Sequence, residues 1–75
     1  MPRLPRVSGA EAIRALERLG FVQVRQRGSP VVLKRVGPDG VTGCVVPVHA
    51  ELAIGPLRGI LKQAGIRAED LIAHL

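Results

Sequence analysis

The 75-residue sequence has almost no aromatic residues and a single cysteine. Phe21 is the only aromatic side chain, so the chain has no set of rings on which unpaired bases could stack. Because Cys44 is alone, the sequence predicts no internal disulfide and no cysteine-based zinc site. We therefore expect neither a metal nor another cofactor, and we expect Cys44 to pack as a small apolar side chain.

Long apolar runs are also absent. No stretch approaches the ~20 residues that a helix needs to cross a bilayer. Residues 1–6 carry charge but lack the apolar centre of a signal peptide. The composition thus indicates no membrane partner and a cytoplasmic location, and the length predicts one domain over residues 1–75.

Acidic residues are missing between Glu17 and Asp39, whereas the whole chain has a net charge of +5. The acid-free stretch contains five cations: Arg18, Arg25, Arg27, Lys34 and Arg35. A local basic patch of this kind favours a polyanionic partner such as RNA. The alternative is an ordinary solvated strand face.

Local signals predict two main helices and a short third one. Ser8 and Glu11 have the spacing of a capping box, so a helix should begin there, run to about Leu19 and end at Gly20. Gly55-Pro56 should open the second helix and Gly65 should close it. Its apolar positions recur with helical spacing: Leu57, Ile60, Leu61 and Ala64. Residues 66–75 should form the last helix.

Three β-rich stretches lie between the helices, at residues 21–27, 31–36 and 41–48. Alternation in the first predicts Gln23, Arg25 and Arg27 on one face, with Val22 and Val24 on the other. In the third stretch, Cys44, Val46 and Val48 should point inward. Pro47 cannot donate to a strand ladder, which indicates an edge strand.

These elements predict an α+β domain of order α-β-β-β-α, a two-layer sandwich. Short connections make the three-stranded sheet antiparallel, and both main helices should cover its one apolar face. The opposite face should be open to solvent and carry Gln23, Arg25, Arg27 and His49.

Several segments together resemble the HicA (YcfA-like) toxins of HicA–HicB toxin–antitoxin systems. They are Gly20-Phe21, residues 25–29, the Val46-Pro47-Val48-His49 strand end and, most specifically, residues 55–66. The resemblance implies a fold similar to a double-stranded RNA-binding domain and metal-independent cleavage of mRNA. It also implies a HicB-like antitoxin as a partner that covers the active face.

The resemblance implies a catalytic histidine directly after the Gly-Ser pair, but Pro30 follows Gly28-Ser29 here. Proline has no titratable group and cannot act as a general acid or base. Among the two histidines, His49 is the remaining catalytic candidate, with Glu51 as a residue that could orient it. The alternative role for His49 is to cap the strand end. His74 is expected at the surface.

We expect Arg25, Arg27, Lys34 and Arg35 to contact RNA phosphates, with Arg58 and Lys62 as a second set. The leading hypothesis is a toxin-like RNA-binding protein whose endoribonuclease activity is impaired by Pro30. The alternative is a non-enzymatic module that binds RNA or docks an antitoxin.

Overall fold

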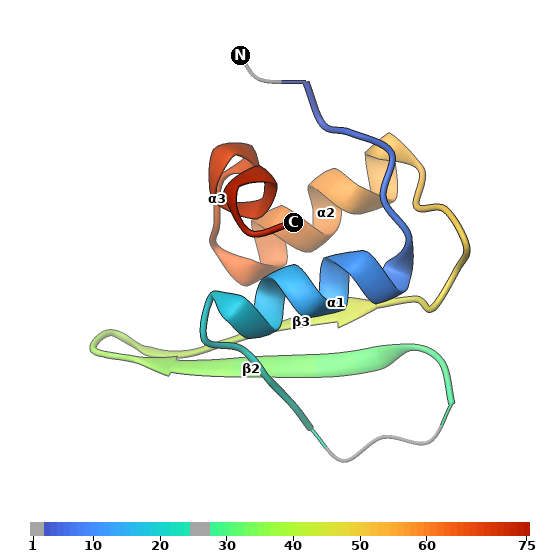
Figure 1. Cartoon of the computed structure of the whole chain (residues 1–75). Coiled ribbons are helices and arrows are strands. Elements are labelled where there is room, and N and C mark those ends of the chain that lie inside the picture. The colour runs from blue at the N-terminus through green and yellow to red at the C-terminus, as the bar shows by residue number, and fades with distance from the viewer. Residues whose placement is uncertain (1–2, 25–27) are drawn as a thin grey trace.

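A computed structural model describes residues 3–24 and 28–75. The chain order is α1 (Gly9–Arg18), β1 (Val22–Gln23), β2 (Val31–Gly37), β3 (Gly40–Val46), α2 (Ile54–Ala64) and α3 (Ala68–Ala73). The sheet is antiparallel with strand order β1-β2-β3, and α1 and α2 lie on the same side of it (Figure 1). The predicted α+β arrangement is confirmed. No helix in the described ranges is long and apolar enough to cross a membrane.

The core lies between the sheet and the helices. The predicted apolar stripe of α2 is buried, and α2 packs mainly against β3. From the sheet side, Leu33, Cys44 and Val46 are buried against the helices. Burial raises the pKa of the Cys44 thiol, so the group stays protonated at neutral pH and packs as an apolar side chain, as expected.

The third strand ends two residues earlier than predicted. β3 ends at Val46, because Pro47 has no N–H to continue the ladder. The prediction that Val48 points inward is wrong, since its side chain is half exposed. Strand alternation predicts His49 on the open face, but His49 lies three residues beyond the end of β3, so that alternation does not apply to it. The position of β3 at an edge of the sheet is confirmed.

The helix ends follow the local signals closely. The Ser8 hydroxyl accepts from the Glu11 N–H at 3.0 Å, and the Glu11 carboxylate accepts from the Ser8 N–H at 2.9 Å. Gly65 ends α2 with φ 69° and ψ 30°, a left-handed conformation that favours glycine. α2 begins at Ile54, slightly earlier than predicted, and Pro56 still falls in the first turn, where a backbone N–H has no helical acceptor.

The side chains of the first strand lie on the opposite sides of the sheet from those predicted. Directly paired residues of antiparallel strands share a face, and Gln23 pairs with Leu33, which is buried under the helices. Gln23 therefore lies on the helix-covered side. Val22 pairs with Lys34, and the Val24 N–H donates to the Val32 carbonyl, which continues the same register. Arg25 and Arg27, predicted to share a face with Gln23, lie outside the described residues.

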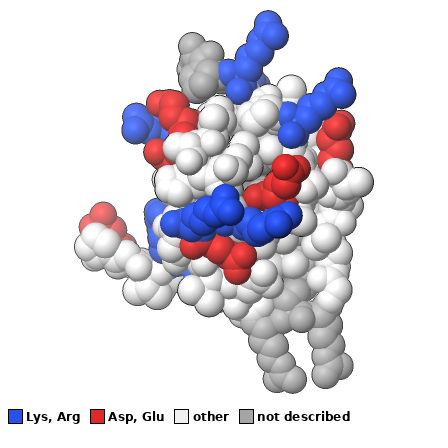
Figure 2. All heavy atoms as spheres, in the orientation of Figure 1, with Lys and Arg blue, Asp and Glu red and all other residues white. Residues whose placement is uncertain are grey.

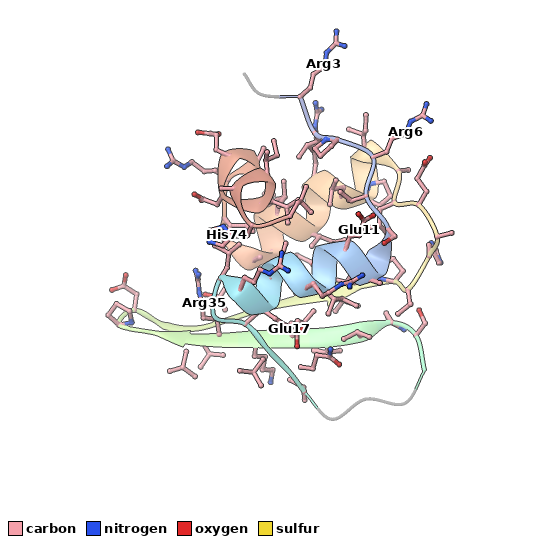
Figure 3. All side chains as sticks on the ribbon, in the orientation of Figure 1. Arg3, Arg6, Glu11, Glu17, Arg35 and His74 are labelled. Carbon is pink, nitrogen blue, oxygen red and sulfur yellow. The ribbon has the colours of Figure 1, made fainter. Side chains whose placement is uncertain are left out.

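The side of the sheet away from the helices is lined by valines, and we call it the open face. Side chains project from it below β2 in Figure 3. By register and alternation, its members are Val22, Val24, Val32, Lys34, Val36, Val41, Gly43 and Val45. Sequence reasoning expected a basic surface here. Among the described residues the open face has a single cation.

The capping box predicts a pH-dependent contribution to stability. Hydrogen bonds from the Ser8 backbone and hydroxyl, and then the charge of Arg14, hold the pKa of Glu11 below its ordinary value of 4.5. The stabilisation is therefore complete above that pH and is lost as the pH falls through the lowered pKa. We expect Glu11→Gln to unfold more easily than the wild type at neutral pH, with the difference closing in acid. Urea unfolding at several pH values measures this. A gap that stays constant into acid contradicts it.

Candidate functional site

The loop with Pro30 contacts the chain segment just after β3. The Ser29 hydroxyl accepts a hydrogen bond from the Val48 N–H at 3.0 Å. The loop before β2 is thereby joined to the residue next to His49, although 19 positions separate Ser29 from Val48. The structure thus brings the two catalytic candidates of the sequence, Pro30 and His49, to one end of the sheet. The Ser29 hydroxyl thereby has a structural contact.

The beginning of α1 completes this region. The Gly9 N–H donates to the His49 carbonyl and the Leu52 N–H donates to the Val7 carbonyl, each at 2.8 Å. Three segments therefore meet, residues 7–9, 28–30 and 47–52, and we call this region the three-segment junction. Gly9 is required for the approach, because a Cβ there would overlap the Pro47 carbonyl oxygen and lie 2.9 Å from the Val48 Cα.

His49 is the one histidine of the three-segment junction. It is exposed, and its carbonyl oxygen is held by α1. Within the described part of the chain, no hydrogen bond joins its imidazole to Glu51 or to another side chain. Its exposure leaves the ring accessible to a ligand, but no described side chain orients it as a general base requires.

His74 has a structural role at the other side of the molecule. Its Nδ1 lies 2.7 Å from the Asp70 carbonyl oxygen, and its own carbonyl accepts from Arg18 Nη1 at 2.7 Å. The first contact lies within the end of α3, and the second ties that end to α1. The expectation of a plain surface residue is therefore incomplete, because the His74 side chain is half-buried.

The adjacent cations Lys34 and Arg35 point to opposite sides of the sheet. Lys34 is exposed on the open face. Arg35 is half-buried on the helix-covered side, where its Nη1 donates to the Leu19 carbonyl at 3.2 Å. Its guanidinium carbon lies 4.7 Å from the centre of the Phe21 ring. Arg35 thus stabilises the turn after α1, and the two residues do not form one patch.

Arg58 and Lys62 occupy a third surface. They are exposed and lie one turn apart on α2, opposite its buried stripe. Over α1, acidic side chains lie among the basic ones (Figure 2), and Glu11, Arg14 and Arg18 line a shallow hollow with Leu75. Of the six predicted RNA contacts, Arg25 and Arg27 lie outside the described residues. The other four are distributed over separate surfaces.

The described residues contain no group of three or more histidine, cysteine or acidic side chains that could hold a metal ion. The candidate chemistry is therefore that of one exposed imidazole and separate cations. Sequence reasoning missed two features of the site: the closeness of Ser29 to Val48, and the apolar character of the open face. Strand alternation was a signal for the apolar open face, because it placed Val22 and Val24 together on the side of the strand opposite Gln23.

A comparison with known protein families matches residues 9–66 to the family described as HicA toxin of bacterial toxin-antitoxin. The chain belongs to the HicA toxin family. The match runs from the first residue of α1 to just beyond α2, so it includes the three-segment junction except residues 7–8, and it leaves out α3. HicA membership gives the chain a place in a toxin–antitoxin pair. A search of curated proteins finds no match.

Two glycine-to-alanine changes test the three-segment junction. Alanine is the better helix former, and at Gly59 of α2 a Cβ meets nothing within 4 Å, so Gly59→Ala should stabilise the fold by about 0.4–1 kcal/mol. Gly9→Ala should destabilise it, because the new methyl group overlaps residues 47–48. Thermal unfolding of both variants measures this. Equal stabilisation by the two changes contradicts the close approach at Gly9.

Proposed function

We propose that this HicA-family chain binds RNA and cleaves it weakly or not at all. The single observation behind the proposal is Pro30, which follows Gly28-Ser29 where the family resemblance implies a catalytic histidine. The proline ring can neither accept nor donate a proton. General acid–base catalysis typically contributes ~10²–10⁴-fold to a rate, so its loss leaves little cleavage.

His49 is the residue that could supply residual activity. Its neighbour Val48 bonds Ser29, which supports placing His49 near the RNA that Gly28-Ser29 would approach. Cleavage through the 2′-hydroxyl generally needs one group to remove a proton and another to protonate the leaving oxygen. One imidazole without an orienting carboxylate serves one of these steps at a time. We therefore assign His49 a minor role.

RNA binding is proposed to rest on phosphate contacts. The chain has no aromatic set for base stacking, whereas it has an excess of cations. Arg25 and Arg27 lie within three residues of Gly28 in sequence and are the main proposed contacts, with Lys34, Arg58 and Lys62 as additional ones. Arg35 is the weakest candidate, because its guanidinium already bonds Leu19. An mRNA substrate would place the activity in the cytoplasm.

Family membership also supports a HicB-like antitoxin as the partner. If no cleavage remains, the chain is a non-enzymatic module that binds RNA and docks the antitoxin. The apolar open face favours this second function, because a surface of valines suits a protein better than a polyanion.

RNA binding should depend strongly on salt. Four to six phosphate contacts predict a slope of log affinity against log salt of roughly −3 to −5, at ~0.7–0.9 per phosphate. The Arg25→Gln/Arg27→Gln variant should have a slope about 1–2 units shallower. Arg67→Gln is the matched control, since this exposed arginine lies 3.9 Å from Glu69 and from Asp70 and should not affect the slope. Fluorescence anisotropy measures all three, and an affinity insensitive to salt contradicts the proposal.

Restoring the histidine should restore cleavage. Pro30→His is expected to raise the rate of RNA cleavage by up to ~10²–10⁴-fold, because the imidazole can transfer a proton near neutral pH. Pro30→Gln is the matched control: it removes the proline without adding a titratable group and should remain inactive. A fluorescent RNA cleavage assay measures the rates. Robust cleavage by the wild type that His49→Ala abolishes would overturn the prediction and make His49 catalytic.

A further inference from the structure

We propose that the open face is the docking surface for a larger acidic protein that presents apolar side chains and one carboxylate opposite Lys34. The proposal rests on the toxin–antitoxin partnership in the proposed function and assigns it a surface and a recognition chemistry. The surface is not the basic one that the sequence suggested.

The open face is unusually apolar for an exposed surface. Val36, Val22 and Val41 are 80%, 68% and 65% exposed. In the paired register, Val36 lies opposite Val41, and Val32 opposite Val45, so the valines form continuous cross-strand rows. Scattered exposed apolar residues are ordinary, but a contiguous patch of this kind marks an interaction site.

RNA does not fit this face. Lys34 is its one cation among the described residues, and its other side chains can neither bond phosphate nor stack on a base. Burying valines against the solvated phosphate backbone would also leave the phosphates without counterions. The open face therefore suits a protein partner better than a polyanionic one.

The strand edges are less suitable than the face for binding another chain. β1 has only two residues, and a very short edge strand offers few backbone groups for pairing. At the β3 edge, the Val45 N–H is already bonded by the Gln63 side-chain oxygen at 3.3 Å. Added strand pairing would compete with that contact. A partner is thus expected on the face of the sheet.

The open face alone is too small to hold two copies of this chain together face to face. β2 has seven residues, so three strands cover at most about 23 by 14 Å, or about 320 Å². Stable interfaces bury about 800 Å² on each partner. Two copies would also each bring a net charge of +5. The partner must therefore contact residues beyond the sheet. The positive charge of this chain favours a partner with a net negative charge.

Lys34 determines the polar part of the recognition. It stands among valines, with no salt bridge within the described residues. When a partner covers the valines, the ammonium group loses water and needs an opposite charge. A carboxylate on the partner, placed opposite Lys34, meets this need and sets the orientation of the complex.

The test uses the full chain co-expressed with the protein encoded by the adjacent gene, and measures their affinity by calorimetry. Val41→Asp should weaken binding about tenfold or more, because it buries an unpaired charge within the contact. Lys34→Glu should weaken it similarly through like-charge repulsion. Ile54→Asp is the matched control. Ile54 is exposed to a similar degree, at 54%, but it lies on α2 and not on the open face. Val41→Thr keeps the strand preference and the side-chain shape, and should weaken binding less than Val41→Asp does.

RNA affinity of the same variants separates this inference from the proposed function. Loss of partner binding in Val41→Asp with RNA affinity unchanged supports the docking surface. Absence of RNA binding in the wild type removes the RNA function alone. The docking proposal is overturned by three results: no complex with the wild type, equal weakening by Ile54→Asp, or a homodimer of the chain alone that Val41→Asp dissociates in sedimentation.

Discussion

Burial of the α2 stripe against β3 is the contact on which the rest of the structure depends. Leu57, Ile60 and Leu61 cover Cys44 and Val46 on one side of the sheet, and α1 adds Ile13 and Leu16 to the same core. The apolar surface of these side chains provides the main stabilisation of so small a chain. With both helices on one side (Figure 1), the other side of the sheet has no cover within the chain.

The three-segment junction depends on the same arrangement. Once α1 lies over the sheet, its first turn meets the end of β3, and Gly9 allows the backbones to touch. The Ser29 contact to Val48 then fixes the loop that contains Pro30. The junction is held by backbone hydrogen bonds and small residues. Its geometry therefore does not require a histidine at position 30, and a member of the family can keep the fold without this group.

The structure separates two kinds of surface that the sequence combines. Valines gather on the open face, where Lys34 is the one described cation. The other described cations lie on the N-terminal segment, α1, α2, the helix-covered side of β2 and just before α3. The RNA and the protein partner proposed above need different chemistry, because phosphates bind cations whereas an apolar protein surface binds valines. Because the loop with Pro30 and the open face are separate surfaces, a substitution at position 30 leaves the valines of the open face unchanged.

The sequence by itself determined the features whose interactions span a few residues. The capping box of Ser8 and Glu11, the left-handed Gly65 and the α2 stripe all depend on neighbours within about one or two helical turns. The element order and the fold class therefore followed from the sequence. Alternation also sorted Val22 from Gln23, but it could not tell which of them faces the core. Only pairing with β2 decided that, because register is a relation between strands. The stacking of Arg35 on Phe21 and the meeting of Ser29 with Val48 likewise join residues distant in sequence, and the tertiary structure alone brings them together.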